Sequence, residues 1–270
     1  MRHRGMTLVE LLSVLGIVSV RLGLLAPSRA GAREAARSAA CASNVRQVTL
    51  ANLYYARDHD GRFVAGAARI ATENLARWHG ARDSTGEAFD PARGALTPYM
   101  AGSGASAALR ACPTFAGTLE ELAEAGLGFE AGAGGYGYNN AFVGVDRVRI
   151  AGVWQVRTDE VGARSARVVE PARTIAFADS AFTGRDRLIE YSFLEPRFWP
   201  DAPEFRPDPS MHFRHGASAD GRATVGWLDG HVSSEAMTWS WAGWSSRLDA
   251  GASGLGWTGE TDDNALFDLD

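Results

Sequence analysis

Cysteine is scarce in this sequence and lysine is absent. The 270 residues include two cysteines, Cys41 and Cys112, and all 27 basic residues are arginines. Two cysteines cannot form a disulfide scaffold, and their separation is not the C-x-x-C spacing of a metal site. They leave two alternatives open, one disulfide bridge in an oxidising compartment or two separately buried thiols. We attribute the missing lysine to genomic composition and infer no function from it.

Concentrated positive charge is missing as well. The formal net charge is −5 and the isoelectric point is about 5.7. Surfaces that bind nucleic acid need clustered lysine or arginine, so we expect no nucleic-acid partner. With 46% hydrophobic and 22% charged residues, the composition is that of a globular protein with one sizeable core.

Motifs of common enzyme classes are also lacking. The sequence has no Gly-x-Ser-x-Gly, no His-Glu-x-x-His and no phosphate-binding glycine loop. Catalysis would have to use His212, His215, Asp229 and His231, which flank a turn and more often cap or solvate one. We therefore expect no enzymatic activity, no catalytic residues and no cofactor.

A cation site is the remaining candidate among the acidic residues. It would use the carboxylates of Asp179 and Asp229 with neighbouring loop carbonyls. Calcium takes six to eight oxygen ligands, and the sequence identifies too few around these two residues. Asp229-Gly230 is explained as the turn between two strands, so we expect no metal.

What the sequence does contain is an apolar N-terminal stretch behind two positive charges. Arg2 and Arg4 precede the stretch from Met6 to Ala26, whose length is close to the roughly 20 residues that cross a bilayer as helix. No clear Ala-x-Ala cleavage site follows it. The positive charges place the N-terminus in the cytoplasm. The expected location is therefore the inner membrane, single-pass, with a periplasmic or extracellular head.

Two charged residues, Glu10 and Arg21, interrupt this stretch. Arg21 lies near its outer end, where a long side chain can reach the head groups. Glu10 has a shorter side chain and needs a partner inside an apolar environment. Glu10 is therefore a candidate functional residue.

The rest of the chain predicts a helix followed by an α+β head. The helix continues to about residue 57, where Asp58 to Gly61 supply a stop. Further on, strands are expected over 174–178, 223–228 and 231–237, with Asp229-Gly230 as a hairpin turn. The expected organisation is a leader peptide over 1–5, a helix over 6–57 with 6–26 transmembrane, a head over 58–250 and a flexible acidic tail over 251–270.

The N-terminal motif carries a resemblance. Gly5-Met6-Thr7-Leu8-Val9-Glu10 resembles the cleavage and methylation motif of type IV prepilins and type II secretion pseudopilins, which usually have Phe where this chain has Met6. The resemblance implies cleavage after Gly5 by prepilin peptidase, N-methylation of Met6 and a role for Glu10 in filament assembly.

Further segments are similar to the large-headed pseudopilin-like proteins abundant in Planctomycetes and Verrucomicrobia. These segments are 55–63, 96–99, Cys112-Pro113 and 136–139. Near its C-terminus that group has a histidine, nine residues and then Asp-Gly-His. Here thirteen residues separate His215 from Asp229-Gly230, which implies a longer hairpin loop in this chain.

The resemblance implies a structural subunit of a type IV pilus-like or type II secretion pseudopilus filament. Its partners would be prepilin peptidase, other pilin or pseudopilin subunits and the inner membrane. The implied fold is α+β and pilin-like, with a long N-terminal helix, membrane-spanning in its first half, packed on an antiparallel sheet. The alternative is a membrane-anchored module that binds glycan or peptide through exposed tryptophans, which would come from Trp199, Trp227, Trp239, Trp241, Trp244 and Trp257.

Overall fold

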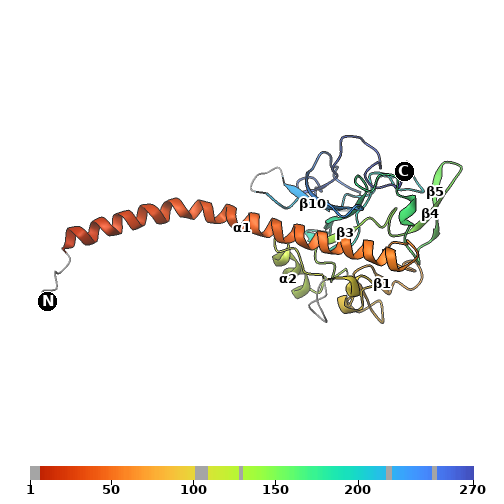
Figure 1. The fold of residues 1–270 in the computed structure, drawn as a ribbon, viewed down its shortest axis with the longest axis horizontal. Helices are drawn as coiled ribbons and strands as arrows, with labels where there is room; N and C mark the ends of the chain where they lie inside the picture. The colour runs from red at the N-terminus through yellow and green to blue at the C-terminus, as the bar shows by residue number, and fades with distance from the viewer. Residues whose placement is uncertain (1–6, 101–108, 128–129, 217–220, 245–247) are drawn as a thin grey trace.

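The protein consists of one long N-terminal helix and a head that is built mainly from loops and short strands (Figure 1). The computed structural model describes residues 7–100, 109–127, 130–216, 221–244 and 248–270, and the side chains of these residues apart from 21–30. The N-terminal half of the helix projects away from the head, and its C-terminal half lies along the head (Figure 1).

The helix α1 spans Leu8–Asp58. Its sequence is rich in alanine, leucine and arginine, which are among the strongest helix formers. Thr7 caps its N-terminus. At the other end the N–H of Gly61 donates to the carbonyl of Ala56 at 2.8 Å, with φ of Gly61 at +73°. A left-handed residue just after the helix lets the chain satisfy the last carbonyls and turn away.

The C-terminal half of α1 packs on a four-stranded antiparallel sheet with strand order β11-β10-β6-β3. Val45, Val48 and Ala51 are buried in this contact. The helix comes so close that a Cβ on Gly226 would lie 2.3 Å from the Thr49 hydroxyl oxygen. Gly226 therefore sets the distance between helix and sheet, because no side chain fits there.

The four-stranded sheet consists of β3 (Tyr136–Tyr138), β6 (Ile175–Asp179), β10 (Arg222–Trp227) and β11 (Val232–Ala236). The other strands form two-stranded sheets: β1 (Ala76–Arg77) with β2 (Gly80–Ala81), β4 (Asp146–Ile150) with β5 (Val153–Thr158), β7 (Phe182–Thr183) with β8 (Leu188–Ile189), and β9 (Met211–His212) with β12 (Leu255–Gly256). One further α-helix is described, α2 (Ala116–Glu124), with short 3-10 turns at Pro91–Arg93, Thr97–Tyr99 and Ser165–Arg167.

The expectation of a membrane-spanning first half is wrong. Within the described part of the chain, no helix is both long enough and apolar enough to cross a membrane. The stretch carries Glu10, Ser13 and Ser19 among its apolar residues, whereas a span needs about 20 predominantly apolar residues. The transmembrane segment 6–26, the single-pass inner-membrane location and the pilin-like fold class that contains them are corrected accordingly. The head also departs from one continuous sheet, because the strands in its described residues form five separate small sheets.

The acidic C-terminal segment 251–270 is packed on the head and is not a loose tail. Strand β12 pairs with β9, and Phe267 and Leu269 are buried. The side-chain amide of Asn139 donates to the carbonyl of Phe267 at 2.7 Å. Leu255 and Trp257 of the same segment are fully buried as well, and burial of these apolar side chains anchors the segment although most of its acidic residues are exposed.

Candidate functional site

The N-terminal half of α1 exposes apolar side chains on every side. Val9 is 74% exposed and Leu12 is 59% exposed. The exposed apolar residues of this part, which we call the apolar segment, are Leu8, Val9, Leu11, Leu12, Val14, Leu15, Ile17, Val18 and Val20. A large exposed apolar surface marks a candidate site for contact with another molecule, so the apolar segment is a candidate contact surface.

Glu10 has a partner within its own chain. Its carboxylate accepts from the backbone N–H of Thr7 at 2.8 Å, and its own N–H donates to the Thr7 hydroxyl at 3.3 Å. This reciprocal capping box closes the first turn of α1. The backbone N–H of Thr7 also lowers the pKa of Glu10, so the residue is charged at neutral pH. Gly5 and Met6, the expected processing positions, lie outside the described residues.

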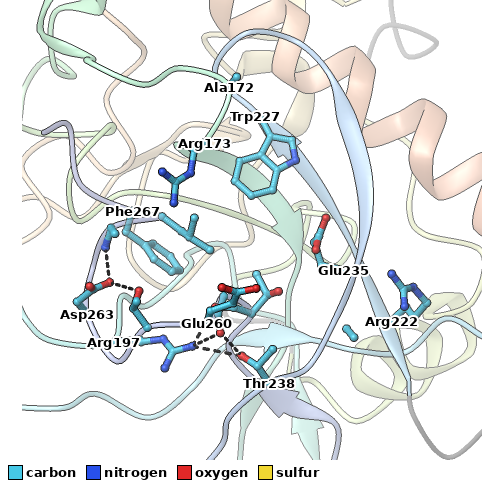
Figure 2. Close-up of a pocket in the computed structure, with 16 residues that line it drawn as sticks. Ala172, Arg173, Arg197, Arg222, Trp227, Glu235, Thr238, Glu260, Asp263 and Phe267 are labelled. Carbon is cyan, nitrogen blue, oxygen red and sulfur yellow. Dashed lines mark hydrogen bonds between the residues drawn. The ribbon is translucent and has the colours of Figure 1, made fainter.

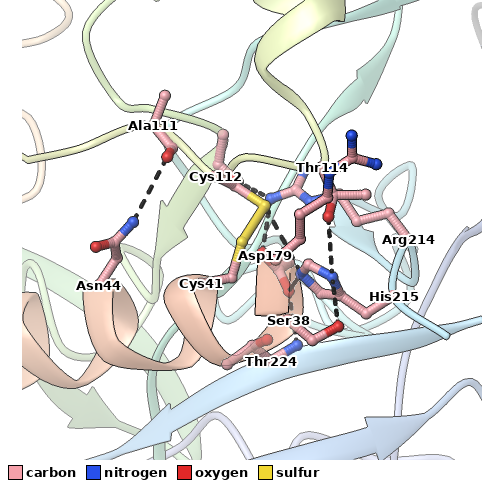
Figure 3. The surroundings of a disulfide bond; sticks show 12 residues. Ser38, Cys41, Asn44, Ala111, Cys112, Thr114, Asp179, Arg214, His215 and Thr224 are labelled. Carbon is pink, nitrogen blue, oxygen red and sulfur yellow. Dashed lines mark hydrogen bonds and ion pairs between the residues drawn. A yellow bond between two sulfur atoms is a disulfide. The ribbon is translucent and has the colours of Figure 1, made fainter. Parts of the chain in front are cut away.

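Cys41 and Cys112 form a disulfide bridge where α1 meets the head (Figure 3). Their Cα atoms are 5.2 Å apart and both residues are fully buried. Of the two alternatives that the sequence leaves open, the structure has the bridge. It ties α1 to the loop that precedes α2, across a separation of 71 residues.

Asp179 and His215 lie beside this bridge. The Asp179 carboxylate at the end of β6 is fully buried and contacts His215 Nε2 at 3.1 Å and Arg214 at 2.7 Å. It also accepts the backbone N–H of Thr224 at 2.7 Å. Burial alone would raise the pKa of this carboxyl, but Arg214 and His215 outweigh burial and lower the pKa to about 2. The group is therefore a permanent buried anion at neutral pH.

The structure separates the three residues of the expected C-terminal box. His215 pairs with Arg222 at the start of β10, whereas Asp229 and Gly230 form the turn after its end. In that turn Gly230 has φ of +92°, and Asp229 accepts the backbone N–H of His231 at 2.9 Å. Asp229 and Gly230 are thus turn residues, while His215 belongs to the buried cluster at the disulfide.

Sequence reasoning missed this cluster of Cys41, Cys112, Asp179 and His215. It treated the cysteines as a pair by themselves, His215 as part of a spacing motif and Asp179 as a candidate cation ligand beside Asp229. The one local signal was the position of Asp179 after a strongly apolar strand, where a charge needs a partner. Nothing in the local sequence indicates which partner that is.

The described tryptophans range from fully buried rings to one exposed ring. Trp78 and Trp257 are fully buried, whereas Trp244 is 69% exposed. The Trp244 indole N–H donates to the carbonyl of Arg206 at 2.8 Å, and its ring is nearly parallel to that of Phe205. A pocket of about 580 Å³ is lined by Phe182, Glu195, Trp199, Phe205, Pro207, Asp208 and Trp244. Its aromatic walls and two carboxylates can stack on a flat or ring-shaped ligand and accept hydrogen bonds from it.

Glu195 in this pocket gives the protein a pH-dependent stability. Burial raises its pKa to about 7, although the Tyr191 hydroxyl that donates to it acts in the opposite direction. The folded protein holds the proton up to a higher pH than the unfolded chain, so stability falls as pH rises from about 4.5 to 7. We expect Glu195→Gln to reduce this fall by on the order of 2 kcal/mol, measured by urea unfolding across that range.

Glu204 supplies the matched control for this prediction, because it is an exposed glutamate near the same pocket. Glu204→Gln should leave the pH dependence of the wild-type protein unchanged. An unchanged slope in Glu195→Gln would show that Glu195 titrates in the folded protein as it does in the unfolded chain.

A second pocket, of about 570 Å³, lies between β10, β11 and the C-terminal segment (Figure 2). Its lining mixes both charges, including Arg173, Arg197, Glu235 and Glu260. The Arg197 guanidinium already has partners within the protein, because it donates to the carbonyl of Thr258 at 3.0 Å and pairs with Asp262. The pocket offers no set of nucleophile, base and oxyanion donors among the described residues, and we assign it no reaction.

Comparison of the chain with models of protein families, with curated proteins and with solved structures finds no match.

Proposed function

We propose that this chain is a structural subunit of a filament of the type IV pilus-like or type II secretion pseudopilus class. In this proposal, neighbouring copies pack through their apolar segments and carry their heads on the outside. Cleavage after Gly5 by prepilin peptidase and N-methylation of Met6 precede assembly. The partners are the peptidase and other subunits of the same filament.

The observation that supports the proposal most directly is the exposed apolar segment of α1. Fully burying one leucine, valine or isoleucine side chain stabilises a complex by about 1.5–3 kcal/mol, and the segment exposes many of them in succession. Copies of the same helix can cover it from all sides at once. The head does not obstruct this packing, because it contacts only the C-terminal half of α1 (Figure 1).

Glu10 gives the assembly a fixed register. A carboxylate inside a bundle of apolar helices needs a positive partner, and the amine created by cleavage before Met6 is the nearest candidate by sequence. In the single chain Glu10 accepts from Thr7, which leaves part of its acceptor capacity for an amine of a neighbouring copy. Removing one member of such a buried pair costs about 3–5 kcal/mol.

Site-specific photo-crosslinking of the full chain in its host cells tests the proposal. Val9 in the apolar segment is 74% exposed and Val169 on the head is 70% exposed, so the two valines form a matched pair. A crosslinker at position 9 should give a ladder of covalent multimers of the chain, and one at position 169 should not. Monomers alone from position 9, or equal ladders from both positions, would contradict assembly through α1.

The role of Glu10 is separated from its capping role by adding Glu10→Gln and Glu10→Ala to the position-9 crosslinking chain. Glutamine keeps an oxygen that can accept from Thr7 but has no charge. Both variants should lower the yield of multimers at least tenfold if the charge pairs with an amine, since about 1.4 kcal/mol corresponds to a factor of ten. A full ladder in Glu10→Gln would limit the residue to helix capping.

A further inference from the structure

Four side chains of ligand chemistry converge where α1 meets the head. One ligand atom of each of Cys41, Cys112, Asp179 and His215 lies within 4.8 Å of the others, and all four residues are buried. They come from four places in the chain: α1, the loop before α2, the end of β6 and the segment after β9. Two sulfurs, one imidazole and one carboxylate make a ligand set of the kind that tetrahedral zinc prefers.

The distances at the His215 side are close to those of such a site. Zinc bonds of about 2.0–2.3 Å at tetrahedral angles place ligand atoms roughly 3.3–3.8 Å apart. His215 Nε2 is 3.1 Å from Asp179 Oδ2 and 3.7 Å from Cys112 Sγ. The four ligand atoms lie within 4.8 Å of one another, so metal binding requires the two bonded sulfurs to separate and small shifts of the other ligand atoms. Reduction of the disulfide permits that separation.

The surroundings of His215 prepare its Nε2 atom for a metal. The other ring nitrogen, Nδ1, lies 3.2 Å from the Ser38 hydroxyl and 3.5 Å from Glu34 Oε1. Glu34 Oε1 is buried and has no hydrogen-bond partner among the described residues. In the disulfide form Nε2 contacts the Asp179 carboxylate; metal binding places the proton on Nδ1, where Glu34 can accept it, and turns the lone pair of Nε2 to the metal. A carboxylate behind the ligating histidine is the usual support of a zinc site.

The charges of the cluster balance with zinc in the reduced state. With the disulfide intact, Asp179 is matched by Arg214 at 2.7 Å, and no further cation is needed. Reduction and ionisation of both thiols add two negative charges in a fully buried place. Two buried anions without a counter-charge are costly, and one divalent cation offsets both.

We propose that the reduced protein binds one Zn²⁺ ion through Cys41, Cys112, Asp179 and His215, and that disulfide formation excludes the metal. A dithiol reductant supplies two electrons and two protons, so that the S–S bond breaks, two thiols form and the reductant becomes a disulfide. Zn²⁺ then displaces the two thiol protons to solvent. The same position of the fold is thus cross-linked by the disulfide in the oxidised protein and by the metal in the reduced protein.

Metal titration of the full chain in its reduced and oxidised forms tests the proposal. Reduced protein should bind one equivalent of Zn²⁺ in competition with a chromophoric chelator, and its thermal melting temperature should rise, because a ligand that binds only the folded state stabilises it. Co²⁺ in place of zinc should show thiolate-to-cobalt charge-transfer absorption. Oxidised protein should show none of these signals.

Variants separate the folded site from adventitious binding to free thiols. His215→Ala should weaken Zn²⁺ binding at least tenfold, and Glu34→Gln should weaken it by about 10–100-fold through loss of the support for His215. His231→Ala, at an exposed histidine in the β10–β11 turn, is the matched control and should bind as wild type. Equal affinity of the reduced wild-type and His215→Ala chains would overturn the proposal, as would reduced protein that unfolds and does not regain structure with Zn²⁺.

Discussion

Reducing the Cys41–Cys112 bridge in metal-free buffer should lower the free energy of unfolding by about 4 kcal/mol. The bridge closes a loop of 71 residues, and the loss of chain entropy in the unfolded state scales with the logarithm of that number. This is a large share of the roughly 5–15 kcal/mol that stabilises a typical domain. Urea unfolding with and without reductant, with a chelator present, measures the difference.

The double variant Cys41→Ser with Cys112→Ser is the control for this result. It should show the lowered stability without reductant and should not change when reductant is added. A reduced wild-type chain within 1 kcal/mol of the oxidised one would mean that the unfolded chain is already compact between these two positions.

Asp179→Asn should destabilise the oxidised protein by about 3–5 kcal/mol. The substitution keeps the size of the side chain but removes its charge, which leaves Arg214 buried without a counter-ion. The backbone N–H of Thr224 also loses a charged acceptor. Urea unfolding at neutral pH measures the loss.

Asp229→Asn is the matched control, because Asp229 also pairs with a histidine but at the surface. Its loss should cost at most about 1 kcal/mol. The change in stability at acid pH supplies an independent check. The pKa of Asp179 is about 2 in the folded protein against an ordinary 3.8, so its contribution is present above about pH 4 and is lost as pH falls toward 2. The assigned role would be contradicted if both variants lost a similar free energy of unfolding. It would also be contradicted if Asp179→Asn lost stability between about pH 4 and pH 2 as steeply as the wild type does.

Structural features that depend only on neighbouring residues in the chain were predictable from the sequence. The hairpin turn at Asp229-Gly230 lies where the sequence places it, between β10 and β11, because a glycine with positive φ is all that the turn requires. The end of α1 was predictable for the same reason, since Gly61 follows the last helical turn. Strand β6 was recognisable from its run of apolar residues alone.

The buried cluster could not be predicted, because it depends on how distant segments meet. Cys41 and Cys112 are 71 residues apart, and Asp179 and His215 are farther along the chain. Each is an ordinary residue in its local setting. Only the packing of α1 on the four-stranded sheet brings them together, and no periodicity or spacing rule encodes that contact.

The membrane-spanning interpretation was wrong because length was weighed more heavily than composition. The stretch from Met6 to Ala26 has the length of a span, yet no helix in the described chain is apolar enough to cross a membrane. The acidic tail was misjudged for a related reason. Its average composition is polar, but Leu255, Trp257, Phe267 and Leu269 are buried in the head, and a few buried apolar side chains outweigh an average.

The position of the disulfide along α1 determines how the protein would respond to a pull on the projecting half of that helix. Cys41 is the first buried side chain of α1 among those that the structure describes, so the bridge lies at the end from which a pulled helix would begin to peel off the sheet. Peeling breaks contacts one after another at low force, whereas a helix fastened at that end must shear all of its contacts together. Tension applied to the projecting half therefore meets the covalent bond first, and the packing of Val45, Val48 and Ala51 behind it is shielded from stepwise rupture.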